Sequence, residues 1–142
     1  MKAVDGEIAQ ILRSAGCKAT QPRVYILLLL SKTKKPLTVQ EIGEKLPKNI
    51  ADQATVYRTV QLLGKIGLVQ EVLFAGHDHA HYEYARRTDH HHIVCRSCDA
   101  VEDFVGCEVK TIQRQALAQS KQFKSIISHA IELSGYCKKC SV

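Results

Sequence analysis

The feature that most constrains how this chain can fold is a pair of Cys-x-x-Cys motifs in its C-terminal part. The first motif is formed by Cys95 and Cys98, and the second by Cys137 and Cys140. Two cysteines at this spacing in a tight turn can bind one metal ion, and two such motifs complete a tetrahedron of thiolates about 2.3 Å from zinc. A domain of about fifty residues has little core of its own, so we expect a structural Zn²⁺ to supply much of its stability.

The start of the chain and its hydropathy indicate which compartment the thiols occupy. Residues 1–5 lack the basic and then apolar layout of a signal peptide. No stretch approaches the roughly 18 consecutive apolar residues of a membrane span. We therefore expect a cytoplasmic protein with no membrane partner, in which paired cysteines bind metal rather than form disulfides. Because a thiolate cluster can oxidise and release its metal, a redox switch stays open as an alternative.

The N-terminal half shows the pattern of several helices followed by a hairpin. Apolar residues recur at helical spacing, Pro22 suits the first turn of a helix, and Thr38 with Glu41 forms a capping box. Helices followed by a two-stranded hairpin are typical of a winged helix-turn-helix. The expected helices cover residues 4–15, 22–31 and 39–46, and a fourth follows the polar break at 48–49 and ends at Gly67. The expected strands cover residues 68–74 and 81–85.

The C-terminal part predicts a small α/β unit around the four cysteines. We expect a strand leading into Cys95, a strand over residues 101–105, a helix over 108–120 and a last strand over 125–133. The fold class is therefore α+β, a winged helix-turn-helix followed by a small α/β domain with a four-cysteine zinc site. The expected domains are residues 1–85 and 90–142, joined by a short polar hinge at 86–89.

The net charge of +6 is confined to the N-terminal half of the 142 residues. Residues 1–65 carry 11 lysines and arginines against 5 acidic side chains, whereas residues 66–142 carry 9 of each. A localised basic surface indicates a polyanionic partner such as nucleic acid or a membrane surface. Charge alone also fits a solvated, lysine-rich face.

A histidine triplet lies directly before the first cysteine motif. On an extended strand His90 and His92 point to one face and His91 to the other. Two imidazoles on one face provide half of a site for zinc, iron, manganese or cobalt. An isolated triplet would more simply be an exposed basic run. The adjacent thiols and the other histidines favour metal binding, and these are His77, His79, His81 and His129.

Four segments together resemble the ferric uptake regulator family of bacterial metal-responsive repressors. The segments are His90–Cys98, Lys18–Arg23, Ala54–Arg58 and Ser128–Leu133, with the second cysteine motif beyond them. The resemblance covers almost the whole chain. It implies a homodimer that binds double-stranded operator DNA, with the C-terminal domain providing the dimer contacts.

The resemblance also implies which side chains touch DNA. The helix with Thr55, Tyr57 and Arg58 would enter the major groove, where Arg58 can read a guanine edge or bind phosphate and Tyr57 can pack on a thymine methyl group. Lys18 and Arg23 would contact the DNA backbone or the minor groove. The alternative for Tyr57 is packing in the core.

Family members sense metal between the two domains, and the matching donors here are Glu83, His90, His92 and Asp103. The regulatory ion would be Zn²⁺ or Fe²⁺. Many iron and peroxide sensors add a histidine just before the third helix, where this chain has Pro36–Leu37 instead. That departure favours zinc over iron. Spacing leaves open whether one of the histidines at 77, 79 and 81 replaces the missing donor.

A further family site corresponds to Asp89, His91 and His129, but this chain has Lys110 where a glutamate is usual. A protonated lysine cannot bind metal. The site is therefore absent, reduced to three ligands or completed by Glu108. We expect the two remaining cysteines, Cys17 and Cys107, to be small packed residues, although a helix N-terminus could make the second one reactive.

Taken together, the sequence predicts a metal-dependent, sequence-specific DNA-binding repressor of metal-homeostasis genes. An enzyme is not expected, because four thiolates leave no room for water on zinc and the His-Glu-x-x-His motif of zinc hydrolases is missing. No small organic substrate is implied. The alternative is a zinc-binding redox or metal-buffering protein without operator specificity, which would not need Arg23, Tyr57 and Arg58.

Overall fold

The computed structural model describes residues 2–85 and 89–141. The chain divides into two compact units, residues 1–87 and 88–142, which are described one at a time. Most of the hinge predicted at residues 86–89 lies outside the described residues. Across the part of the chain that is described, no helix combines the length and apolar character needed to cross a membrane.

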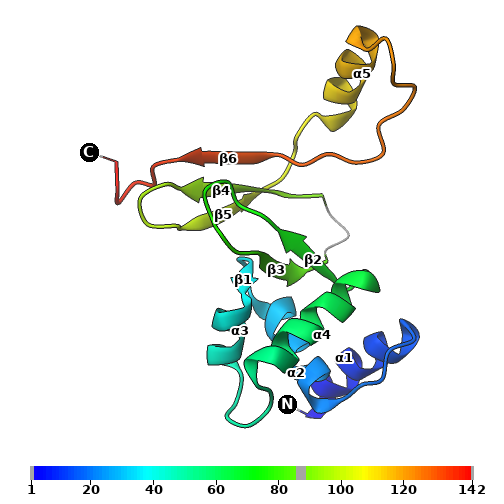
Figure 1. Ribbon diagram of the computed structural model, residues 1–142, viewed down its shortest axis with the longest axis vertical. Coiled ribbons are helices and arrows are strands. Elements are labelled where there is room, and N and C mark those ends of the chain that lie inside the picture. Colours follow the sequence, from blue (N-terminus) through cyan, green and yellow to red (C-terminus); the bar gives the residue numbers. More distant parts are fainter. Residues whose placement is uncertain (1, 86–88, 142) are drawn as a thin grey trace. The chain divides into compact units, whose positions relative to one another are not determined.

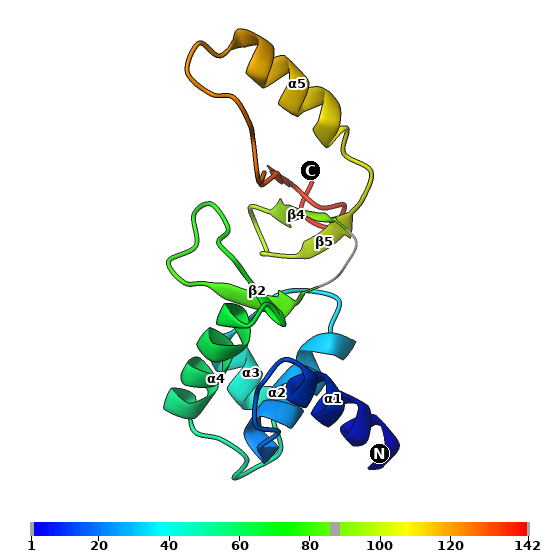
Figure 2. The same ribbon diagram turned by 90° about the vertical axis from the view of Figure 1, so that its right-hand side faces the viewer.

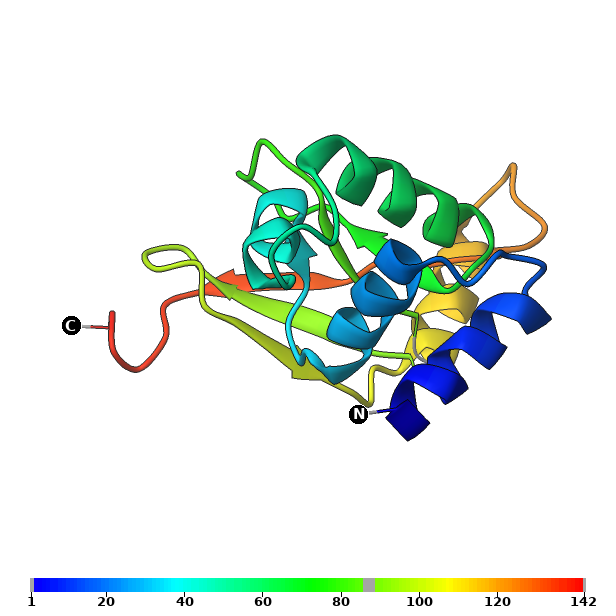
Figure 3. The ribbon, with the colours of Figure 1, turned by 90° about the horizontal axis from the view of Figure 1, so that it is seen from below.

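The first unit consists of helices and a small antiparallel sheet. Strand β3 lies at the centre of this sheet, in the order β1-β3-β2 (Figure 1). Figure 3 shows α2 lying between α1 and α4. The elements are α1 (Lys2–Ser14), α2 (Gln21–Lys32), β1 (Leu37–Thr38), α3 (Val39–Lys45), α4 (Gln53–Lys65), β2 (Val69–Val72) and β3 (His81–Tyr84).

Side-chain caps define where two of these helices begin. The Thr38 hydroxyl accepts a hydrogen bond from the Glu41 N–H at 3.1 Å, and the Glu41 carboxylate accepts one from the Thr38 N–H at 2.9 Å. This pair is the predicted capping box, and it starts α3. Asp52 caps α4 in the same manner, since its carboxylate accepts the Thr55 N–H at 2.7 Å. Two carboxylates thus satisfy backbone N–H groups that the first turn leaves unpaired.

One continuous apolar core holds the first unit together. It draws on all four helices and on the sheet, so each element is held by its neighbours. Cys17 belongs to this core, as expected for a small packed residue. The side chains without any exposed surface include Leu12, Ile26, Leu27, Leu37, Ile42, Val56, Val60 and Leu63.

The second unit is a three-stranded sheet with one helix. Strand β4 (His91–Cys95) is central, antiparallel to β5 (Val101–Phe104) and parallel to β6 (Glu132–Gly135). Helix α5 (Val109–Gln119) stands away from these strands and has no buried residue (Figure 2). The fold class predicted from the sequence, a winged helix-turn-helix followed by a small α/β domain, is confirmed.

The last strand differs from the prediction, which placed it at residues 125–133. It covers only Glu132–Gly135, because β6 needs only to run beside the short strand β4. The apolar residues that suggested an earlier start do not face a core. Ile127 is 96% exposed.

Candidate metal centres and nucleic-acid interface

The four cysteines of the two motifs converge at one end of the second sheet. Parallel pairing of β4 with β6 sets Cys95 opposite Gly135, so the two motifs that follow these strands lie side by side. All four sulfur atoms lie within 4.8 Å of one another, and the sulfurs of Cys98 and Cys137 are 3.7 Å apart. All six cysteines of the chain are free thiols. This donor set fits the tetrahedral thiolate coordination of zinc and indicates a structural zinc site.

Electrostatics within the cluster explain why a cation belongs there. Hydrogen bonds from the N–H groups of Cys137 and Ser97 lower the pKa of Cys95 to about 6. The Ala100 N–H also acts to lower the pKa of Cys98, but hydrogen bonds with the other three thiols outweigh it and raise that pKa to about 12. One thiol thus ionises readily while its neighbour resists. Thiolates this close together repel one another. A bound dication would offset that repulsion and keep all four thiols deprotonated.

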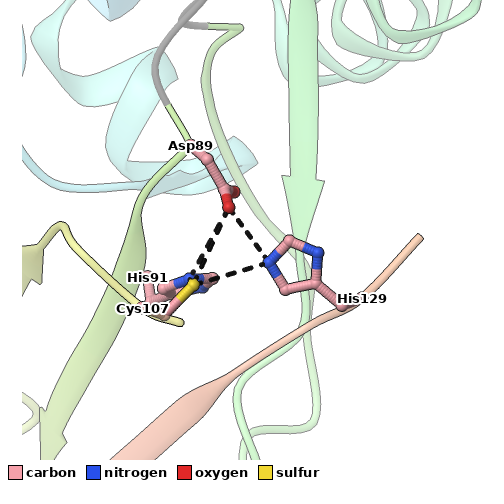
Figure 4. A network of polar contacts seen from close by, with 4 residues as sticks. All are labelled: Asp89, His91, Cys107 and His129. Carbon is pink, nitrogen blue, oxygen red and sulfur yellow. Dashed lines mark hydrogen bonds and ion pairs between the residues drawn. The ribbon is translucent and has the colours of Figure 1, made fainter. Parts of the chain in front are cut away.

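A second cluster, wholly within the second unit, joins Asp89, His91, Cys107 and His129 (Figure 4). The Cys107 sulfur lies 2.6 Å from His91 Nε2, and the His129 Nε2 lies 3.0 Å from the Asp89 carboxylate. The remaining distances, from His91 to Asp89 and from Cys107 to Asp89 and His129, are 3.8–3.9 Å. Thiolate, imidazole and carboxylate donors pointing at one spot fit a tetrahedral transition-metal ion.

The sequence missed the fourth member of this second cluster. Lys110 is exposed on α5, and Glu108 accepts a hydrogen bond from Thr111 at 3.1 Å, so neither completes the set. Cys107 takes that place and is not the packed residue that we expected. Gly106, with a φ of 91°, reverses the chain after β5 and returns Cys107 toward His91 on β4. An unassigned thiol near a histidine-rich strand was the signal available in the sequence.

His90 directly precedes β4, and His91 and His92 are its first two residues. His91 packs on Phe104 and His129, with ring centroids 5.2 Å away in each case. The rings of His90 and His92 lie 5.2 Å from each other, apart from that cluster.

The four donors expected for the regulatory ion come from both units. His92 lies opposite Asp103 in the register of β4 and β5, and its Nε2 is 3.6 Å from the Asp103 carboxylate. His92 is buried and His90 is half-buried. Glu83 lies on β3 of the first unit, where it is 2% exposed. A carboxylate so fully removed from water needs hydrogen bonds or a cation to stabilise its charge.

Helix α4 presents the residues expected at DNA on its solvent face. Its buried face is formed by Val56, Thr59, Val60 and Leu63, whereas Tyr57 is 53% exposed and Arg58 is exposed. Packing of Tyr57 in the core is therefore excluded. The Arg58 guanidinium donates to the Thr55 hydroxyl at 3.3 Å, which holds these two polar groups together.

The two other residues expected at DNA lie on either side of the start of α2. Lys18 is exposed in the α1–α2 loop. Arg23 turns back along this loop, donating to the Lys18 carbonyl at 3.1 Å and to the Cys17 sulfur at 3.5 Å. These contacts brace the loop.

Comparisons with known proteins match most of the chain to one family of regulators. The model of the ferric uptake regulator family matches residues 14–134. A ferric uptake regulation protein of Legionella pneumophila is 33% identical over 137 residues, which cover 94% of this chain and 98% of that protein. A peroxide-responsive repressor of Staphylococcus aureus is 30% identical over 131 residues, which cover 91% of this chain and 86% of that protein.

A solved structure supports the same assignment at the level of the fold. The ferric uptake regulator of Helicobacter pylori matches 98% of this chain and 92% of its own chain with a TM-score of 0.77. The two sequences are 22% identical, so the likeness concerns the fold alone.

Proposed function

This chain belongs to the ferric uptake regulator family of metal-responsive transcriptional regulators, and we propose that it is a dimeric, sequence-specific repressor of metal-homeostasis genes. Members of this family are not enzymes. The observation that carries the proposal is the solvent face of α4. Tyr57 and Arg58 are exposed there, while the opposite face of the same helix packs in the core. A metal buffer would gain nothing from this face.

The DNA contacts follow from the chemistry of these side chains. The guanidinium of Arg58 suits a guanine edge in the major groove, and the ring of Tyr57 suits a thymine methyl group. Thr55 and Lys18 would contact phosphates, while Arg23 would hold the Lys18 loop in place and add positive charge. The excess of basic residues over residues 1–65 favours association with a polyanion.

The proposed regulatory ligands are Glu83, His90, His92 and Asp103. They would hold Zn²⁺ or Fe²⁺, and the ion would supply coordination bonds to donors from both units. The absence of a donor at Pro36–Leu37 favours zinc. Two imidazoles with two carboxylates form a set of borderline and hard donors that suits either ion. We assign the second cluster of Asp89, His91, Cys107 and His129 to a further Zn²⁺, because its thiolate is a softer donor.

A second copy of the chain is the expected partner of the second unit. Family members bind operator DNA as dimers, and the second unit carries apolar side chains that nothing in its own fold covers. A second copy would bury such a surface. In the described residues of this unit they are Ile93, Val105, Ile112, Phe123, Ile127, Leu133 and Tyr136.

Selection from a random duplex DNA library tests the proposal directly. With Zn²⁺ or Fe²⁺ present, the dimer should enrich a palindromic sequence, since two recognition helices related by a twofold axis read matching half-sites. Removal of the loosely held metal should abolish the enrichment. If the protein binds the added metal and still enriches no sequence, the metal-buffering alternative is favoured.

A further inference from the structure

The loop between β2 and β3 gathers three histidines that the proposed sites do not use. His77, His79 and His81 each place a ring nitrogen within 4.8 Å of the others. Their ring centroids are 5.2–6.0 Å apart. All three belong to the first unit, so this wing histidine cluster is complete within one part of the molecule.

A buried aromatic ring holds two members of the wing histidine cluster in place. Phe74 is 3% exposed, and its ring lies 4.8 Å from that of His81 and 5.7 Å from that of His77. The loop is also closed by a tight turn, in which the His77 N–H donates to the Phe74 carbonyl at 3.1 Å. Gly76 permits this turn with a φ of 86°. The cluster is therefore built by the fold and is not a chance meeting of free side chains.

An unsatisfied polar atom points to a ligand at this cluster. His81 starts β3 and is 8% exposed, and its Nδ1 is buried with no hydrogen-bond partner among the described residues. Buried polar atoms almost always have a partner, so an exception requires an explanation. A metal ion bound at the cluster would give this nitrogen the partner that the fold does not provide.

We propose that His77, His79 and His81 form a metal site of their own, which binds one exchangeable divalent ion of the late first-row class, such as Zn²⁺, Ni²⁺ or Cu²⁺. Three imidazoles suit these ions and leave positions for water, so the ion exchanges more readily than one held by four thiolates. The site does not depend on the proposed regulatory set. The competing interpretation is that the cluster merely completes that set, since Glu83 follows His81 by two residues on β3.

The position of His79 gives the site a route to DNA binding. His79 and Tyr57 both line a groove of about 670 Å³ between the loop, α3 and α4. An ion that fixes the ring of His79 therefore changes the lining of the groove that Tyr57 also lines. We expect occupancy of this site to change operator affinity in addition to the effect of the regulatory ligands.

Zinc stoichiometry of the full-length dimer tests the proposal. The variants are H77A/H79A, H90A/H92A and the combination of all four changes, with His81 kept because it is buried. Zinc bound in addition to the tightly held structural ion is counted by calorimetry and elemental analysis. Each double variant should lose one ion per chain, and the fourfold variant should lose two. Asp78→Ala, an exposed change between the two histidines, is the matched control and should lose none.

Two results would overturn the proposal. H77A/H79A could bind as much zinc as the unchanged protein, or the fourfold variant could lose only the ion that each double variant loses, which would mean one shared site. If H90A/H92A alone keeps its full zinc content, the regulatory assignment fails while the wing histidine cluster stands. Should the alanine pair fail to fold, H77Q/H79Q keeps similar side-chain size and polarity, and the same loss is expected of it.

Discussion

Leu12, Ile26 and Leu63 of the first unit are completely buried, whereas helix α5 of the second unit buries no residue at all. In the second unit the described apolar side chains that are buried are Val94 and Cys95, and the buried histidines His91 and His92 accompany them. The first unit therefore has an apolar core of its own. The second has converging thiols, imidazoles and carboxylates in place of a core, together with a large exposed apolar surface.

This difference indicates what each unit needs in order to fold. Burial of apolar surface suffices for the first unit, since its helices and sheet meet in one continuous cluster. A second unit of about fifty residues buries too little surface for an apolar core, so we expect it to depend on metal and on a partner copy. Loss of metal should then unfold one half of the molecule and leave the other half folded. The predictions below test this division.

Removal of one zinc ligand should have the largest effect. Cys95→Ser takes away a thiolate from a cluster whose ion contributes stability on the order of 10 kcal/mol. We expect loss of the structural zinc and loss of hydrogen-exchange protection over residues 89–141, while residues 2–85 stay protected. Ser97→Ala, an exposed change beside Cys95 that leaves all four thiolates and the second cluster intact, is the control. Unchanged zinc content in Cys95→Ser would contradict the assignment.

A cavity in the apolar core should destabilise the first unit and leave the second unit unchanged. Leu27→Ala deletes a side chain with no exposed surface and should cost about 2–5 kcal/mol. Hydrogen exchange should quicken in the first unit only, and the structural zinc should remain bound. Loss of zinc from this variant would show that the two units do not fold independently.

Loss of the regulatory imidazoles should make operator affinity independent of added metal. H90A/H92A leaves Glu83 and Asp103, and carboxylates alone suit calcium and magnesium better than zinc or ferrous ion. Operator affinity should stop responding to added metal, and the lost coupling should be about 1–3 kcal/mol. Fluorescence anisotropy with labelled operator measures this response. Dimerisation and the structural zinc of the four cysteines, measured alongside, should not change. A response equal to that of the unchanged protein would place sensing elsewhere.

A change on the solvent face of α4 should affect DNA binding and nothing else. Arg58→Ala should weaken operator binding by about 1–3 kcal/mol if the guanidinium reads a base. Its thermal unfolding and dimerisation should match those of the unchanged protein, because Arg58 is exposed. Identical binding curves at fixed salt would show that α4 is not the reading helix.

The capping box should give the smallest effect, and one that depends on pH. Burial acts to raise the pKa of Glu41, but the Thr38 N–H and Lys35 outweigh it and lower that pKa below 4.5. The ionised carboxylate therefore stabilises the fold above pH 4.5, and this contribution is lost as the pH falls through the folded pKa.

Glu41→Ala should accordingly cost less than about 1 kcal/mol at neutral pH and still less in acid. Thermal melts of both proteins from neutral to acidic pH measure the difference. Glu44→Ala, on the same helix, is the control and should show no such trend. A cost that grows toward acid would refute the role given to Glu41.

The sequence by itself determined the features that depend on short spacings. Thr38 and Glu41 are three residues apart, so their mutual hydrogen bonds follow from the geometry of one helical turn. The cysteine pairs are also local motifs, and the apolar spacing of α4 already left Tyr57 and Arg58 facing solvent. The winged helix-turn-helix and the α/β unit followed from the order of such local patterns.

Only the tertiary structure decided which distant residues meet. Cys107 joins Asp89, His91 and His129 because Gly106 reverses the chain and β4 receives neighbours on both edges. The placement of β6 seven residues later than the predicted start depends on strand register, and the packing of His77 and His81 on Phe74 depends on a turn. Local propensity carries no information on such contacts, because the free energy of each is set by partners that are far away in the chain.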